Sequence, residues 1–239
     1  LLCNSSYGDQ LEVWEIEYYS TQTTVPATNQ TFMTRTMTDN LSLVKVKENA
    51  ACVTPYGIVV AGGVVDNPRT TATSTSLVYW PHGYHEYNSA NDFSLGISRS
   101  LPNMVEPVAD HCLVWHKGMV YRVGGANAAG TALSEYERFN FDTNTWQQMT
   151  VHSAIRRHKA AACSHGDEIF IFGGRSGGAN IKTAYAWNPE TNMVRQIADV
   201  PKAAAYSMTA VSCGSSIYLI GGSDSGTSGP SRSIWKFTP

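Results

Sequence analysis

The stretch IFIFGGRSGG at residues 169–178 decides the fold, because its first six residues recur in altered form along the chain. Strand-forming apolar residues run into a glycine pair in each copy. The first glycines of the pairs, at 62, 124, 173 and 221, are 62, 49 and 48 residues apart. A near-constant spacing of about 50 residues indicates a repeat architecture. The copies are GIVVAGG, MVYRVGG, IFIFGG and IYLIGG, ending at Gly63, Gly125, Gly174 and Gly222.

Each repeat predicts four short strands and no helix. A strand of small residues precedes the glycine strand, as in DHCLVW at 110–115 and KAAAC at 159–163. A tyrosine follows the pair by eleven residues at Tyr136 and Tyr185, and an Asp/Asn turn then leads to another strand. Units of four strands and about 50 residues are typical of β-propeller blades.

The glycine pairs predict structural turns. A phosphate-binding loop would need a helix after the glycines and usually a lysine, and neither follows here. A strand that ends where a neighbouring backbone passes closely needs residues without a Cβ atom and with positive φ. The predicted turn residues are Gly62, Gly63, Gly124, Gly125, Gly173, Gly174, Gly221 and Gly222.

The glycine pair, the tyrosine and FDTNTW at 141–146 resemble the kelch repeat. The resemblance is close over 110–200, fair over 205–239, weaker over 44–98 and poor over 1–38. This chain departs from the pattern at Cys3-Asn4, which replaces a glycine pair, and in a long insertion before Tyr79; it also lacks a tryptophan at 193–195. The resemblance implies a β-propeller of kelch type.

We therefore expect an all-β fold, a kelch-type propeller over 1–239 with about five four-stranded blades. The first blade would lack its inner strand and the last its outer strand. Kelch relatives usually have six or seven blades, so either five blades close here or the chain is part of a longer polypeptide; the incomplete blades favour the second. The approximate repeats are 1–43, 44–105, 106–154, 155–203 and 204–239.

Composition excludes some classes of partner. The net charge is −2 and no basic stretch is interleaved with aromatic residues, so nucleic-acid binding is not expected. The sequence has no run of 18 apolar residues, so a membrane-spanning helix is not predicted. Without a C-x-x-C pair, the five cysteines predict free core thiols on inner strands rather than disulfides or a metal site. They are Cys3, Cys52, Cys112, Cys163 and Cys213.

The compartment stays undecided between the cell interior and secretion. Unpaired cysteines in core positions favour a reducing compartment. A charged fraction of 15% and N-x-S/T sequons at Asn4, Asn29 and Asn40 favour secretion.

Arginines on the loops that follow the glycine pairs or link the blades predict a partner-binding face. Arginine binds carboxylates through two hydrogen bonds, so these side chains suit a protein or acidic peptide segment. The resemblance adds that an arginine just before a first strand commonly has this role in kelch-type adaptors, and Arg157 in RRHKAAAC matches that position. Replacing it with alanine would then weaken binding and leave the fold intact. The other interpretation is that these are ordinary solvated charges. The candidates are Arg69, Arg156, Arg157, Arg175 and Arg232.

The function expected from the sequence is non-catalytic protein binding through the loops, with no catalytic residue and no cofactor. A first alternative is an architectural subunit that joins a larger assembly through blade edges and insertions. A second is a kelch-type copper oxidase, for which Tyr84-His85 is the one tempting pair. A solvated turn also explains that pair.

Overall fold

The computed structural model describes residues 2–4, 12–18, 32–37, 48–65, 71–80, 97–201, 204–224 and 233–239. Within these ranges the chain forms antiparallel β-sheets and one short 3-10 turn, η2 (Ser153–Ile155). The prediction of an all-β fold is confirmed.

Three sheets have four strands each, in the chain order expected for blades, except that the third also encloses a small hairpin. We name each sheet by its first strand. The β4 sheet contains β4 (Ala50–Thr54), β5 (Gly57–Ala61), β6 (Ser76–Trp80) and β7 (Ile97–Leu101). The β8 sheet contains β8 (Ala109–His116), β9 (Met119–Ala126), β10 (Glu135–Asn140) and β11 (Thr145–Thr150). The β12 sheet contains β12 (Ala161–His165), β13 (Glu168–Phe172), β16 (Ala184–Asn188) and β17 (Met193–Ile197).

Two further sheets have three strands each in the described residues. One consists of β1 (Leu2–Asn4), β2 (Glu12–Tyr18) and β3 (Phe32–Met37). The other, the β18 sheet, consists of β18 (Ala204–Cys213), β19 (Ser216–Asp224) and β20 (Ile234–Phe237). The hairpin of β14 (Arg175–Ser176) and β15 (Ala179–Asn180) follows the glycine pair of the β12 sheet.

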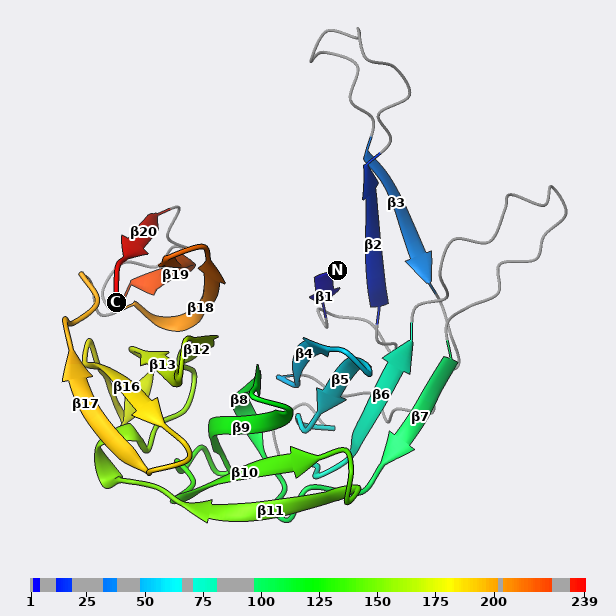
Figure 1. The fold of residues 1–239 in the computed structure, drawn as a ribbon, viewed down its shortest axis with the longest axis horizontal. Helices are drawn as coiled ribbons and strands as arrows, with labels where there is room; N and C mark the ends of the chain where they lie inside the picture. The colour runs from blue at the N-terminus through cyan, green and yellow to red at the C-terminus, as the bar shows by residue number, and fades with distance from the viewer. Residues whose placement is uncertain are drawn as a thin grey trace, which may run out of the picture.

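The sheets lie along an arc, with β4, β8 and β12 on its inner side and β7, β11 and β17 on its outer side (Figure 1). Neighbouring first strands contact one another: β4 with β8, β8 with β12, and β12 with β18. This is the arrangement of propeller blades, whereas a total of five or more blades stays a prediction. We call the contact region between two adjacent sheets a seam and name it by the two first strands.

The apolar core lies in the seams, and β13 shows why its sequence is an unbroken apolar run. Successive strand residues point to opposite faces of a sheet. Ile169 and Ile171 therefore join the cluster between the β8 and β12 sheets, with Trp187 and Tyr121, whereas Phe170 and its neighbour Phe172 join the cluster between the β12 and β18 sheets. Burial of one such side chain stabilises the fold by about 1.5–3 kcal/mol. A sheet buried on both faces needs apolar residues at every position.

Each glycine pair lies at or directly after the C-terminal end of a second strand, namely β5, β9, β13 and β19. All eight glycines have positive φ. At Gly124 a Cβ atom would lie 2.5 Å from the carbonyl oxygen of Arg157, which belongs to the segment entering the next sheet. The N–H of Gly125 donates to that same carbonyl at 2.9 Å, and Gly63 donates to Val108 at 2.7 Å. The pairs thus permit close contact between the backbones of neighbouring sheets.

Cys52, Cys112, Cys163 and Cys213 are free, and all four lie on first strands. The side chain of Cys3 lies outside the described residues. Cys163 is buried, while Cys52 and Cys112 are half-buried. Burial raises the pKa of each of these three thiols to about 12. The Cys112 thiol donates to the carbonyl of Ala160 across the β8–β12 seam at 3.1 Å. The prediction of core thiols is confirmed for these three, whereas it is wrong for Cys213, which is exposed at the end of β18.

Gly124→Ala should destabilise the fold far more than Gly118→Ala. Both glycines have positive φ, so both variants carry a similar backbone strain of about 1–2 kcal/mol. Nothing lies within 4 Å of a Cβ atom built on Gly118, whereas the one on Gly124 would collide with the Arg157 carbonyl. Urea unfolding should show an additional loss of at least about 1 kcal/mol for Gly124→Ala. Equal losses would show that the close approach does not matter.

Thiol labelling should separate Cys213 from the other described cysteines. Cys213 is exposed at the end of β18 and should react rapidly in the native protein. Cys52, Cys112 and Cys163 should react only after denaturation, because their thiols are protonated at neutral pH and packed in the seams. Mass spectrometry after native and denatured labelling provides the measurement. Rapid native labelling of all three would contradict their placement.

Candidate functional site

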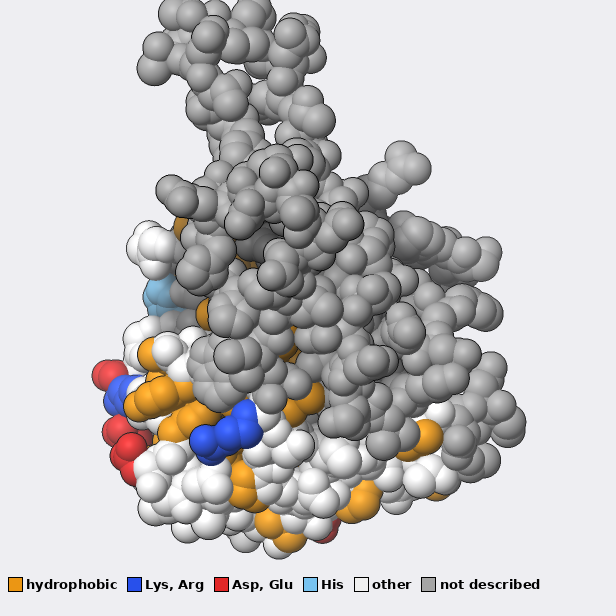
Figure 2. All heavy atoms as spheres, turned by 90° about the vertical axis from the view of Figure 1, so that its right-hand side faces the viewer, with side chains coloured by type: hydrophobic (Ala, Val, Ile, Leu, Met, Phe, Trp, Pro, Cys, Tyr) orange, Lys and Arg blue, Asp and Glu red, His pale blue; other side chains and the backbone are white. Residues whose placement is uncertain are grey.

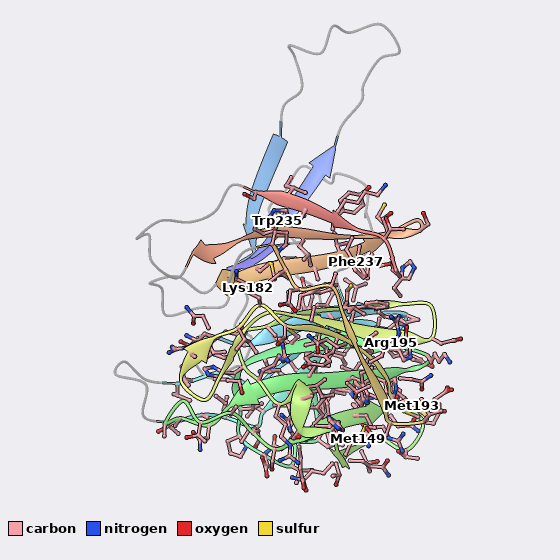
Figure 3. All side chains as sticks on the ribbon, turned by 90° about the vertical axis from the view of Figure 1, so that its left-hand side faces the viewer. Met149, Lys182, Met193, Arg195, Trp235 and Phe237 are labelled. Carbon is pink, nitrogen blue, oxygen red and sulfur yellow. The ribbon has the colours of Figure 1, made fainter. Side chains whose placement is uncertain are left out.

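Strand order divides the loops between two faces. Second strands end and first strands begin at the same edge of each sheet, so the loops after the glycine pairs and the links between sheets share one face. We call it the loop face; its described parts are 48–49, 62–65, 71–75, 102–108, 127–134, 151–160, 173–183 and 198–201. The turns between first and second strands and between third and fourth strands form the opposite, hairpin face. Lys182 on the loop face and Met193 next to a hairpin-face turn appear on opposite sides in Figure 3.

The inner edge of the loop face is a chain of backbone contacts between sheets. Glu48, Asp110 and Lys159 occupy equivalent positions at the start of first strands, with φ of 59, 56 and 56°. The N–H of Asp110 donates to Glu48 at 3.2 Å, and the N–H of Lys159 donates to Asp110 at 2.8 Å. The side chains pair as well: His158 Nδ1 and Lys159 Nζ lie 3.6 and 3.7 Å from Asp110 Oδ2. We call these four residues the inner rim.

Arg175 lies on the loop face beside the inner rim and is fixed there by its backbone. Its N–H donates to the carbonyl of His158 at 2.8 Å, and the N–H of His158 donates to the carbonyl of Arg175 at 3.1 Å. Its guanidinium is partly exposed and donates to Gly178 at 2.7 Å. Arg156 is also partly exposed, with one contact to the Val151 carbonyl at 3.5 Å. The structure therefore keeps two of the predicted arginines partly exposed on this face.

Arg157 does not have the position that its sequence context suggested. Its side chain is 1% exposed, and its guanidinium donates to the carbonyls of Gly173, Thr183 and Ala154 at 2.9, 2.7 and 2.7 Å. It also lies 5.0 Å from the centre of the Tyr185 ring. Burial lowers the pKa of this guanidinium, which the nearby tyrosines oppose. The prediction that Arg157 is a solvated loop charge offered to a partner is thus wrong, because loop carbonyls already occupy its donors.

The β8 sheet satisfies the equivalent glycine carbonyl in another way. Arg122 donates to Gly124 at 2.9 Å, as Arg157 does to Gly173, but it comes from the second strand itself. It is fully buried with Glu137, its ion-pair partner at 3.0 Å. The Glu137 carboxylate in turn accepts the N–H groups of Val105 and Glu106 in the incoming link. Sequence reasoning missed this pair, although a charged residue in the apolar run MVYRVGG was a usable signal.

A cluster of aromatic residues on the hairpin face was also missed. The rings of Tyr56 and Phe141 stack with centroids 4.3 Å apart, and Trp115 approaches both edge-on at 6.1 Å. Tyr56 is 46% exposed. The three residues come from the β4–β5 turn, the end of β8 and the β10–β11 turn, so the chain sequence alone does not bring them together.

The remaining predicted residues are not brought into a site. Arg69, Arg232 and the Tyr84-His85 pair lie outside the described residues. Among the residues that the structure describes, no group of three or more His, Cys, Asp or Glu side chains could hold a metal ion. No helix in those parts of the chain is long and apolar enough to cross a membrane. On the side drawn in Figure 2, the coloured Lys and Arg side chains form no continuous basic surface.

Arg157→Ala should unfold the domain more readily than Arg156→Ala. Removing the buried guanidinium takes a donor from three carbonyls, of which Thr183 keeps the N–H of Gly173 at 3.2 Å. Each buried carbonyl left without a donor costs about 1–3 kcal/mol, and the lost side chain adds a cavity. We expect a loss of at least about 3 kcal/mol for Arg157→Ala. The neighbouring control, Arg156→Ala, should lose less than about 1 kcal/mol. The free energy of urea unfolding provides the comparison, and similar losses would refute the structural role of Arg157.

The fold of this chain resembles that of a solved protein structure. The solved structure titled "Structure of YjhT" superposes with a TM-score of 0.61 over 81% of this chain, at 13% sequence identity. At that identity the likeness concerns the fold alone. The chain spans 63% of the length of that structure. No curated protein matches this chain.

The family match rests on the same repeats from which the sheets are built. The KLHDC2/KLHL20/DRC7 Kelch-repeats domain matches residues 48–239, which include the β4, β8, β12 and β18 sheets with all four glycine pairs. The match covers well over half of the chain. The protein therefore belongs to the kelch-repeat family of β-propellers.

Proposed function

We propose that this domain is a non-catalytic protein-binding module that takes an acidic partner segment on its loop face. Kelch domains commonly act as protein-interaction modules, which supports the general role. The observation that carries the proposal is the rigid placement of Arg175 and Lys159, both partly exposed, next to each other on that face. Binding residues are typically found on loops that a rigid scaffold positions.

Basic side chains on the loop face suit an acidic segment. Lys159 and Arg175 are joined there by the partly exposed Arg156 and the exposed Lys182. The same face carries Glu48, Glu106 and the exposed Asp199, so the proposal depends on the placement of Lys159 and Arg175 and not on net charge. The Asp110 carboxylate of the inner rim lies close to His158 and Lys159, so much of its charge is compensated within the protein. The guanidinium of arginine binds a carboxylate through two parallel hydrogen bonds, which gives the contact a fixed geometry.

The non-catalytic part of the proposal agrees with the state of three of the four free cysteines among the described side chains; the fourth, Cys213, is exposed. A thiol acts as a nucleophile only as the thiolate. Cys52, Cys112 and Cys163 have pKa values of about 12, because burial disfavours the charged form, and they are protonated near neutral pH.

An architectural role is the second candidate, and strand β20 favours it. In the described residues β20 pairs with β19 alone, whereas β10 and β16 each have strands on both sides. Ile234 on β20 is 65% exposed. This edge could take a further strand, from this protein or from another chain. Figure 3 shows Trp235 and Phe237 of this strand next to the β12 sheet.

Exchanging the loop-face cations for alanine should weaken binding without unfolding the domain. The probe is a set of fluorescent peptides that differ in Asp and Glu content, followed by partners captured from the native source. Lys159→Ala with Arg175→Ala should weaken binding of acidic peptides at least about tenfold, because each contact to a charged group contributes about 1.5–3 kcal/mol. Higher salt should weaken it as well.

The matched control is Arg195→Ala, which removes an exposed guanidinium on β17 that pairs with Glu168 at 2.7 Å. It should leave affinity unchanged. A partner whose affinity is insensitive to salt and to the double variant would overturn the proposal. If Ile234→Asp then weakened binding, the architectural candidate would take its place.

A further inference from the structure

Histidines on the first strands bridge the seams near the axis of the arc. His116, at the end of β8, has its Nδ1 atom 2.8 Å from the Ser164 hydroxyl of β12. His165, at the end of β12, repeats this contact with Ser212 of β18, also at 2.8 Å. His111 lies toward the other end of β8, where its Cε1 atom would be 2.5 Å from a Cβ atom on Gly62. Its imidazole thus fills the space that the glycine of the β4 sheet leaves.

His116 is buried in a way that disfavours its charged form. It is 1% exposed, and its Nε2 atom is buried without a hydrogen-bond partner. Burial lowers its pKa, and the adjacent Lys117 lowers it further, while Glu190 and Asp167 oppose this. Lys117 Nζ lies 3.3 and 2.9 Å from those two carboxylates, which reduces their stabilisation of a protonated His116. The remaining neighbours are the Ser164 hydroxyl and the edge-on ring of Tyr121.

His111 is less able still to accept a proton in the packed seam. It is 8% exposed, and neither ring nitrogen makes a hydrogen bond of good geometry. Burial lowers its pKa to about 3, and Arg122 of β9 contributes in the same direction. The Asp110 carboxylate and the nearby carbonyl of Ala61 oppose the shift weakly. From the β4 sheet, the backbone of Ala61 and Gly62 lies close to the ring.

We propose that acid loosens the two seams that β8 makes, with the β4 sheet and with the β12 sheet, before it unfolds the individual sheets. A histidine released from a seam into water has a pKa of about 6.5. Both folded-state pKa values are lower, so the stabilisation is complete above about pH 6.5 and is lost as the pH falls below it. Below that pH, each histidine lowers the equilibrium constant for closing its seam by up to about tenfold per pH unit. Because each seam contains one of these buried imidazoles, the loss of stability falls on the contacts between sheets.

Hydrogen exchange of backbone amides that bridge the seams tests the proposal. The reporters are Gly63, which donates to Val108, and Lys159, which donates to Asp110. The comparison is Ile171 in the middle of β13. Between about pH 7.5 and 5, after correction for intrinsic exchange, protection of the reporters should fall at least about tenfold. Protection at Ile171 should fall much less.

Glutamine variants distinguish histidine protonation from general acid destabilisation. His111→Gln with His116→Gln removes the two imidazoles on which the proposal rests and leaves His158 beside Asp110 in place. Its reporter amides should therefore lose most of the fall in protection seen in the unmodified protein across this pH range. The control His152→Gln changes an exposed histidine and should behave like the unmodified protein. If the double variant does not fold, His116→Gln alone tests the β8–β12 seam through Lys159. The proposal would be overturned if protection of the reporter amides in the unmodified chain did not change with pH. It would also be overturned if the acid-induced fall in protection persisted in the glutamine variants.

Discussion

The structure depends on one close approach, made where the second strand of a sheet ends against the backbone entering the next sheet. The carbonyl of Arg157 accepts from Gly125 and stands 2.5 Å from where a side chain on Gly124 would begin, and Val108 has the same relation to the Gly62–Gly63 pair. No residue with a Cβ atom fits there without moving the backbone of a neighbour. The close approach at each glycine pair therefore sets how tightly adjacent sheets can pack.

The rest of each seam is arranged around this contact. The first-glycine carbonyl is bound by a buried guanidinium, from Arg122 in the β8 sheet and from Arg157 in the β12 sheet. Tyr136, the tyrosine that follows the pair by eleven residues, donates its hydroxyl proton to the carbonyl of Ile155 in the next link. Polar contacts thus fix the ends of the links, and the apolar clusters between sheets fill the remaining space. Loops fixed in this way can present charges to a partner in constant positions.

The sequence predicted what is local and repeated. Apolar runs, glycine pairs and their spacing identified the strands, because burial on both faces and positive φ select residue types at single positions. It misplaced Arg157, because an arginine in a polar link reads the same whether its guanidinium faces water or three buried carbonyls. The Arg122–Glu137 pair and the Tyr56–Trp115–Phe141 cluster join different strands and turns, so only the register and packing of the sheets reveal them.

The most direct test of this account is a measurement of scalar couplings across hydrogen bonds by NMR. The critical pairs are the Gly63 nitrogen with the Val108 carbonyl carbon and the Gly125 nitrogen with the Arg157 carbonyl carbon. We expect couplings at both pairs comparable to those inside the sheets, such as between β13 and β16. Clear couplings within the sheets and none at the two glycine pairs would contradict the account, because the sheets would then not be joined through their glycines.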